Sequence, residues 1–281
     1  MIDAMLREYS ERFEEILKGY LPDGDSTVAR AMRYSLADGG KRIRPALVMA
    51  FCELFGEDAA QAEAFAVAIE MVHTYSLIHD DLPCMDNDDY RRGRLSCHRK
   101  FGERAALLAG DALLTEAFEV AADSRAAVKI IAKAAGERGM IGGQWLDLSH
   151  EKKKMDRAQL EEMNRRKTGA LLGAACALGC LAAGAGEAQT AAALRYADAL
   201  GLLFQLTDDI LDVTSVPETL GKSIGKDEAA GKNTWVSLLG LPQAKLLAKE
   251  LSVLAQQEIV PYAGEDAFLC CLPDWLVGRE Y

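Results

Sequence analysis

Apolar residues recur every three or four positions along nearly the whole chain, and the strict alternation typical of strands is almost absent. That spacing places the apolar side chains on one face of an α-helix. Glycine- and proline-containing segments interrupt the pattern, and the abundant alanine favours helix. We therefore expect an all-α protein, a single domain over residues 1–281 with about ten helices. The pattern predicts helices at 28–37, 43–55, 62–79, 105–122, 126–140, 158–181, 188–213 and 244–259.

The net charge and composition exclude some classes of binding partner. The 281 residues carry a formal net charge of −11, which disfavours nucleic acid and anionic membrane surfaces. The longest apolar run, 170–186, is short for a bilayer and rich in Ala, Gly and Cys, so we expect a buried helix and no stable membrane insertion. Seven cysteines without a C-x-x-C pair, and an N-terminus without a signal-peptide core, indicate a reduced, cytoplasmic protein.

A first acidic motif lies at the end of the predicted helix 62–79. Asp80 and Asp81 occupy its last turn, Pro83 prevents its continuation, and Asp86 follows in the loop. Carboxylates at a helix C-terminus are unfavourable because the helix dipole is negative there. A bound cation would compensate, and a solvated acidic loop is the alternative.

A second acidic motif lies within the predicted helix 188–213. Asp208 and Asp212 are four residues apart and share a helix face, with Asp209 beside them and apolar residues around them. Buried unpaired carboxylates are costly, and magnesium with phosphate oxygens is the best remedy. Two such clusters facing each other would hold a diphosphate–magnesium complex.

Basic residues stand where an anionic substrate would need them. Lys41 and Arg44 open the predicted helix at residue 43, where free backbone N–H groups attract anions. Arg91 and Arg92 directly follow the first motif, and their forked donors suit phosphate oxygens. His73 is two turns before the aspartates on nearly the same face, although a core histidine is the commoner case.

Lysines and glycines follow the second motif. Lys222, Lys226 and Lys232 stand among glycines, as in a flap that closes over phosphate. A solvated loop is the alternative interpretation. Another basic segment, residues 165–169, contains Lys167 and Thr168.

This ordered set of motifs resembles the short-chain trans-prenyl diphosphate synthases, and bacterial farnesyl diphosphate synthases in particular. The resemblance covers residues 27–241 and is carried by residues 40–45, 73–81, 91–93, 142–144, 167–169 and 205–212. It implies the isoprenoid synthase fold, a helical bundle around a deep central cavity, in a homodimer that uses Mg²⁺. It also implies head-to-tail condensation of isopentenyl diphosphate with dimethylallyl and then geranyl diphosphate.

The resemblance assigns roles to individual residues. Isopentenyl diphosphate would be held by Lys41, Arg44, His73 and Arg92. Magnesium would be bound by Asp80, Asp81, Asp86, Asp208, Asp209 and Asp212. The allylic diphosphate would be held by Arg91, Lys167, Thr168, Gln205, Lys222, Lys226 and Lys232. Among these, the residues expected to act in catalysis are Asp80, Asp81, Asp86, Asp208, Asp209, Lys167 and Lys222.

Product length would depend on the side chains beneath Asp80. Tyr75 stands five residues earlier, next to Ser76, and a bulky residue there would stop chain growth at C15, as (2E,6E)-farnesyl diphosphate. Tyr75 could also be ordinary core packing, and C10 and C20 products stay open.

Other classes fit the sequence less well. Terpene cyclases and head-to-head condensing enzymes lack the segment 40–45 and the Arg91–Arg92 pair. A catalytically silent partner subunit would be expected to have lost aspartates from one motif, and a di-iron bundle needs Glu-x-x-His pairs that this chain lacks. One departure from the resemblance is Pro273, at a position where relatives continue a helix.

Overall fold

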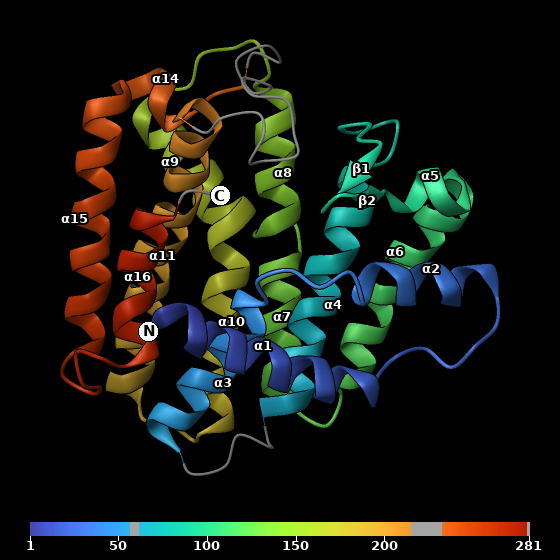
Figure 1. Ribbon diagram of the computed structural model, residues 1–281, viewed down its shortest axis with the longest axis horizontal. Coiled ribbons are helices and arrows are strands. Elements are labelled where there is room, and N and C mark those ends of the chain that lie inside the picture. Colours follow the sequence, from blue (N-terminus) through green and yellow to red (C-terminus); the bar gives the residue numbers. More distant parts are fainter. Residues whose placement is uncertain (57–61, 215–231, 280–281) are drawn as a thin grey trace.

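The computed structural model describes residues 1–56, 62–214 and 232–279, and within them the chain is a bundle of helices with one two-stranded hairpin. Figure 1 shows the helices packed side by side, with the hairpin above the end of α4. The first half contains α1 (Ile2–Lys18), α2 (Thr27–Leu36), α3 (Ile43–Phe55), α4 (Glu63–Asp80), β1 (Tyr90–Arg91), β2 (Arg94–Leu95), α5 (Cys97–Phe101), α6 (Glu103–Val120) and α7 (Arg125–Ala135). The second half contains α8 (Met140–Ser149), α9 (Arg157–Asn164), η2 (Arg165–Gly169), α10 (Ala170–Ala182), α11 (Glu187–Thr214), α14 (Trp235–Leu239), α15 (Leu241–Ile259) and α16 (Phe268–Gly278).

The helix α10 lies at the centre of the bundle and packs against α3, α4, α7 and α11. Its small side chains let neighbours approach closely: a Cβ on Gly179 would lie 2.7 Å from the Cβ of Phe51 on α3. The expected buried helix in the apolar run 170–186 is therefore confirmed. Within the described residues, no helix combines the length and the apolar character that crossing a bilayer requires.

Two of the predicted helices were too long. The segment 126–140 is not one helix, because α7 ends at Ala135, a turn closed by the bond from Gly139 N to Gly136 O (2.9 Å) follows, and α8 begins at Met140. The segment 158–181 is divided into α9, the π-helical turn η2 and α10. The predicted helices 43–55 and 62–79 correspond closely to α3 and α4.

The last helix, α16, continues through Pro273. Proline has no N–H to donate to the carbonyl four residues earlier, which here belongs to Leu269. The hydroxyl of Tyr196 on α11 donates to that oxygen instead, at 2.9 Å. A partner from another helix thus compensates for the missing hydrogen bond, and Pro273 is accommodated without ending α16.

Candidate active site

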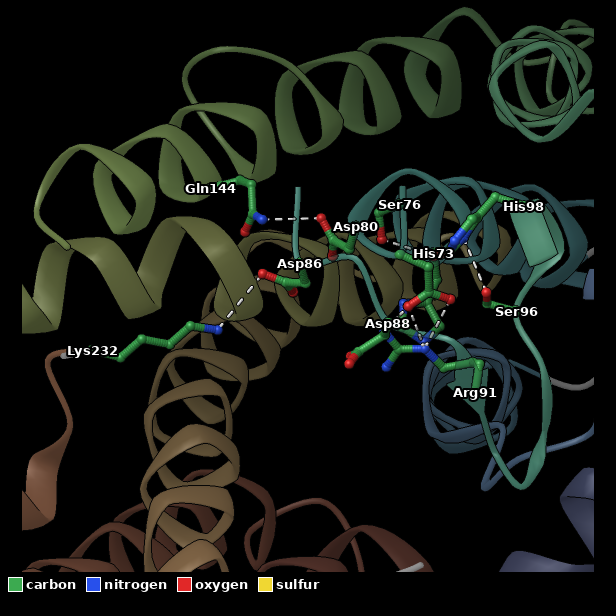
Figure 2. Close-up of polar contacts among 11 residues, drawn as sticks. His73, Ser76, Asp80, Asp86, Asp88, Arg91, Ser96, His98, Gln144 and Lys232 are labelled. Carbon is green, nitrogen blue, oxygen red and sulfur yellow. Dashed lines mark hydrogen bonds and ion pairs between the residues drawn. The ribbon is translucent and has the colours of Figure 1, made fainter. Parts of the chain in front are cut away.

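The first acidic motif surrounds the C-terminal end of α4. Asp80 is the last residue of the helix, and the chain folds back so that Asp86 N donates to Asp80 O at 2.9 Å. Gln144 from α8 donates to Asp80 Oδ1 at 3.0 Å (Figure 2). Burial raises the pKa of Asp80 to about 6, against the opposing effect of Lys167. The predicted end of the helix and the position of Asp86 in the following loop are both confirmed.

Asp81 is held by the hairpin that follows the motif. Its side chain is only 3% exposed and accepts from Arg91 on β1, whose Nε lies 3.1 Å from Oδ1 and whose Nη2 also donates. Burial lowers the pKa of Arg91, but the hydrogen bond to Asp81 and the charge of Asp81 raise it by more, so the pKa of Arg91 is raised overall. Asp81 and Arg91 therefore form a buried ion pair.

The tip of the hairpin reaches the segment before α3. Arg92 and Gly93 both have positive φ, 50° and 77°, as a two-residue hairpin turn requires. Arg92 Nη1 donates to Gly39 O at 2.5 Å. A Cβ on Gly40, whose φ is 104°, would lie 2.7 Å from Arg92 Cζ, so glycine is needed there. Arg92 is thereby held beside the start of α3.

Arg44 and Arg92, with His73 beside them, form a cationic cluster next to the hairpin, close enough for their charges to influence one another. Burial lowers the pKa of His73 well below its ordinary value, and the charges of Arg44 and Arg92 lower it further. Burial also lowers the pKa of Arg44, and its buried Nε has no hydrogen-bond partner. A buried donor left unpaired is costly, and an anionic ligand would satisfy it. The three residues predicted on separate motifs therefore share one environment.

Arg42 fixes the turn that carries Lys41 and Arg44. It is the N-cap of α3 in the left-handed conformation (φ 47°), and its side chain is fully buried. It donates to Glu14 at 2.7 Å, to Glu70 at 2.8 Å and to Leu36 O at 2.6 Å. The sequence analysis did not assign Arg42 a role, because nothing in the motif distinguishes its charge from those of its neighbours.

The second acidic motif projects from α11. Asp208 accepts from Arg279 at the end of α16, and burial raises the pKa of Asp208 while Arg279 and Lys41 oppose the rise. Arg279 is a site residue that the sequence analysis missed. Asp212 borders a hollow of about 690 Å³ that is also lined by Lys232.

Asp209 has structural partners within the described chain. Its carboxylate accepts from Gln205 Nε2 at 2.9 Å and from the backbone N of Trp235 at 2.8 Å. Gln205 in turn accepts from Thr168 Oγ1 at 3.2 Å. Asp209 therefore links α11 to η2 and caps α14, and its predicted contact with magnesium stays a prediction.

Lys167 lies in the π-helical turn η2, close to both α8 and the first motif. Its Nζ pairs with Asp147 at 2.5 Å, and its charge acts on the pKa of Asp80. A Cβ on Gly143 of α8 would lie 2.6 Å from Lys167 Cα, so the two backbones touch. A π-turn inside an α-helix is frequent at functional sites because it redirects the side chains beyond it.

Lys232 brings the second half of the chain to the first motif. Its Nζ lies 3.8 Å from Asp86 Oδ1, and Figure 2 shows it approaching from the side opposite Arg91. The next residue, Asn233, holds Lys232 in place through bonds to Met155 N (2.9 Å), Lys153 O (2.9 Å) and His150 O (3.1 Å). Lys222 and Lys226 lie outside the described residues.

Tyr75 and Ser76 lie on α4 below the aspartates. Tyr75 is 5% exposed, its ring contacts that of His79 edge to face at 5.6 Å, and its hydroxyl has no hydrogen-bond partner. Burial raises the pKa of Tyr75 to about 12, so the hydroxyl is neutral. Ser76 Oγ donates to His73 O at 2.8 Å. The ring of Tyr75 is thus buried against His79 on α4, and its predicted role in limiting product length stays a prediction.

The carboxylate oxygens of the two acidic motifs are ligands that magnesium prefers, but they do not form a complete metal site. In the described parts of the chain, no three acidic, histidine or cysteine side chains gather closely enough to hold a metal by themselves. Magnesium usually binds one or two carboxylates and completes its shell with water and substrate phosphate oxygens. The carboxylates of the two acidic motifs, together with the cationic cluster, therefore suit a magnesium ion that binds as a complex with a diphosphate.

Comparison with known proteins identifies the family. The profile described as Polyprenyl synthetase matches residues 25–259. The chain is 44% identical to the farnesyl diphosphate synthase of Escherichia coli, over 92% of each chain. It is 47% identical to the chloroplastic geranylgeranyl pyrophosphate synthase 3 of Arabidopsis thaliana, over 90% of this chain and 74% of that one.

Solved structures agree with these sequence matches. The geranyltransferase of Helicobacter pylori, complexed with magnesium and isoprenyl diphosphate, superposes with a TM-score of 0.84 at 33% identity, covering 98% of this chain and 95% of that one. This likeness confirms the predicted helical fold as well as the resemblance drawn from the motifs. The chain belongs to the polyprenyl synthetase family and is a prenyltransferase.

Proposed function

We propose that the protein condenses isopentenyl diphosphate with dimethylallyl and then geranyl diphosphate, using magnesium, and releases (2E,6E)-farnesyl diphosphate. The observation that carries this proposal is the unpartnered, buried Nε of Arg44, in a cationic cluster with Arg92 and near the carboxylate of Asp208. A diphosphate would satisfy this cluster, and a second diphosphate with its metal would satisfy the carboxylates. The two substrates of a head-to-tail condensation need these two kinds of site.

The residues divide between the two substrates. Arg44, Arg92 and Lys41 would bind isopentenyl diphosphate, with neutral His73 as a hydrogen-bonding neighbour. Lys167 and Lys232, both close to the first motif, would hold the allylic diphosphate. Lys222 and Lys226, outside the described residues, keep the same predicted role. Asp80, Asp86 and Asp208 would hold the metal, with Asp81, Asp209 and Asp212 beside them.

The chemistry follows from this division. Bound magnesium would supply positive charge to the departing diphosphate. Lys167 and Lys232 would add to that stabilisation as the allylic C–O bond breaks. The cationic cluster would hold the diphosphate of isopentenyl diphosphate and thereby position its double bond near the developing allylic cation. The new carbon–carbon bond then forms, a proton leaves to the released diphosphate, and no side-chain base is needed.

Tyr75 supports a C15 product. Its buried ring lies one and a half turns below Asp80, where a growing chain would extend. The relatives bear the names of both farnesyl and geranylgeranyl synthases, so a C20 product is the specific alternative. We expect Tyr75→Ala to lengthen the main product by at least one isoprene unit. A product profile that stays at C15 in this variant would place the stop elsewhere.

Product analysis tests the proposed function. The purified protein is incubated with magnesium, isopentenyl diphosphate and dimethylallyl diphosphate, and the dephosphorylated products are separated by chromatography. We expect a C15 alcohol from the wild type, and a loss of turnover by at least about 100-fold in Asp80→Ala and Asp208→Ala. Asp123→Ala, at an exposed position, is the matched control. No product from a folded wild type would instead favour the silent-subunit alternative.

A homodimer is part of the proposal. The helices α6 and α8 flank the aspartate-bearing α4, through the contact of Leu107 O with His79 Nε2 (3.0 Å) and of Gln144 with Asp80. Their outer faces expose large apolar side chains, including Leu108 (52%) and Trp145 (68%). A second copy of the chain would cover them. The proposed cytoplasmic location stays a prediction, because the plant relatives are chloroplastic.

A further inference from the structure

Arg279 occupies the second acidic cluster. It follows the last residue of α16, and its side chain is 6% exposed. Its Nη2 donates to Asp208 Oδ1, to Thr207 Oγ1 at 2.8 Å and to Phe204 O at 3.3 Å, and its Cζ lies 4.8 Å from the centre of the Phe204 ring. All of these partners lie on α11, so Arg279 attaches the end of α16 to that helix.

The same helix face also contacts the cationic side of the site. Trp275, one turn before Arg279, donates through Nε1 to Asp3 on α1 at 2.8 Å. Lys41 Nζ lies 5.1 Å from the centre of the Trp275 ring. α16 therefore contacts Lys41 and Asp208 at once, one residue from each of the two proposed substrate sites.

Charge around Asp208 is already compensated in this arrangement. Burial raises the pKa of Asp208, and the positive charges of Arg279, Lys41 and Arg44 oppose that rise because they favour the ionised form. Arg279 and Lys41 also repel each other, because Arg279 contributes to lowering the pKa of Lys41, after burial. A divalent cation approaching Asp208 would meet three positive groups, one of them bonded to the oxygen that it needs.

We propose that Arg279 is a built-in counter-ion that competes with the divalent cation for Asp208. This inference rests on the proposed function, in which Asp208 is a metal ligand. Metal alone then binds weakly at the second cluster, and it displaces Arg279 when a diphosphate arrives with it and neutralises the surrounding positive charge. The contact between α16 and α11 thereby couples metal binding at Asp208 to the presence of substrate.

The test measures Mn²⁺ binding without any turnover. Free Mn²⁺ is followed by electron paramagnetic resonance in the full-length protein, with no substrate present. Removing the competitor in Arg279→Gln should tighten Mn²⁺ binding by about 5- to 150-fold. Arg195→Gln, which removes an exposed arginine paired with Glu258 at 2.7 Å, is the matched control and should stay within about two-fold of wild type.

A double variant separates competition from a general effect of charge. The double variant Asp208→Asn/Arg279→Gln should bind Mn²⁺ no more tightly than Asp208→Asn alone. Arg279 competes with the cation only for the carboxylate of Asp208, and both variants lack that carboxylate. A gain that persists there, or Mn²⁺ affinity in Arg279→Gln that is unchanged or weaker, overturns the inference. Arg279→Ala repeats the measurement if Arg279→Gln does not fold.

Wild-type behaviour distinguishes this inference from the proposed function. Normal prenyl product with unchanged Mn²⁺ affinity in Arg279→Gln would overturn the role of Arg279 and leave the proposed function intact. No product from the wild type, together with no Mn²⁺ binding in any variant even when inorganic diphosphate is added, would count against both.

Discussion

Arg44 illustrates how a single buried charge can be arranged for a ligand. Burial lowers the pKa of its guanidinium, and its buried Nε has no hydrogen-bond partner. The buried Arg42 two residues earlier has two carboxylates and a carbonyl as partners. One arginine is therefore satisfied by the fold, and the other is left for an anion.

This contrast predicts opposite effects on stability and on substrate binding when Arg44 is changed. Arg44→Gln removes a charge that the fold disfavours, so the melting temperature should be equal to or higher than that of wild type. The loss of charge-assisted hydrogen bonds should raise the KM for isopentenyl diphosphate by about 10- to 100-fold. Steady-state kinetics and thermal unfolding measure the two effects. A large fall in melting temperature with an unchanged KM would give Arg44 a structural role instead.

The raised pKa of Asp80 predicts that the stability of the metal-free protein depends on pH. Its pKa is about 6 in the folded chain, raised from 3.8, so folding disfavours its ionised form. Below the lower value the carboxyl is protonated in both folded and unfolded chains, and its contribution cancels. As the pH rises through about 6 the folded wild type carries an ionised, desolvated carboxylate, and this destabilisation is then complete.

Asp80→Asn lacks that destabilisation, so its advantage in melting temperature over wild type should grow between about pH 4 and pH 7 and then level off. Thermal unfolding in the presence of a chelator measures it, with the exposed Asp123→Asn as control. An advantage that is constant over this range would show that the pKa of Asp80 is not raised in the folded chain.

Sequence reasoning named most of the candidate site residues because charge beside apolar surface is conspicuous, and their roles stay predictions. The aspartates of both motifs, Arg91 and Lys167 were each named before their contacts were known, and the structure brings them to one end of the bundle. Arg279 was missed because it is separated from Asp208 by 71 residues and no motif accompanies it. Only the packing of α16 against α11 brings the two together.

At the scale of single elements, the π-turn η2 determines where Lys167 and Thr168 point. The helical period continues from α9 into α10, so residues 158–181 were predicted as one helix. A π-turn adds one residue to a helical turn without changing which residue types are favoured, and the pattern of apolar residues does not reveal it. The turn at residues 136–139 was also missed, although its two glycines are the usual signal for an interruption.

The contact between α8 and η2 predicts a cost for one added methyl group. A Cβ on Gly143 would lie 2.6 Å from Lys167 Cα and 2.7 Å from Arg166 C, and backbone atoms cannot yield cheaply. Gly143→Ala should lower the free energy of unfolding by about 1–3 kcal/mol and reduce kcat, because η2 must shift. Urea unfolding and product formation measure the two effects.

Gly173 offers the matched control for this substitution. It lies within α10, and a Cβ there would have no heavy atom within 4 Å. Gly173→Ala should raise the free energy of unfolding by about 0.5–1 kcal/mol through helix propensity alone. Equal effects of the two substitutions would mean that the close approach of α8 and η2 does not constrain Lys167.

For the whole molecule, the arrangement of helices connects two motifs that are more than 120 residues apart in the sequence. The helices α4 and α11 both pack against the central α10, which carries small side chains. Lys232 then reaches Asp86 across the end of the bundle. The sequence pattern predicts α4 and α11, but it gives no helix at the positions of α1 and α16. The relative placement of the helices depends on long-range packing, as with Gly179 against Phe51, that no local pattern specifies.

Exposed apolar side chains on α6 and α8 predict how the chain assembles. Leu107 and Leu108 on α6 are 47% and 52% exposed, and Ile141 on α8 is 48% exposed. α6 packs against α4, and Gln144 of α8 donates to Asp80 at the end of α4. A partner subunit that covers α6 and α8 would therefore also support the candidate site. If this face is the homodimer interface, charges placed on it must be desolvated on association, and the dimer should dissociate.

Light scattering coupled to size-exclusion chromatography should therefore give the mass of a dimer for wild type and that of a monomer for Leu107→Asp/Leu108→Asp. Leu254→Asp on α15, where the leucine is 54% exposed, is the matched control and should stay dimeric. Turnover should fall in the monomeric double variant and persist in the control, because α6, which packs against α4 within the chain, loses the support of the partner subunit. A double variant that remains dimeric and fully active would place the interface on another face, and a monomeric wild type would remove the dimer from the proposed function altogether.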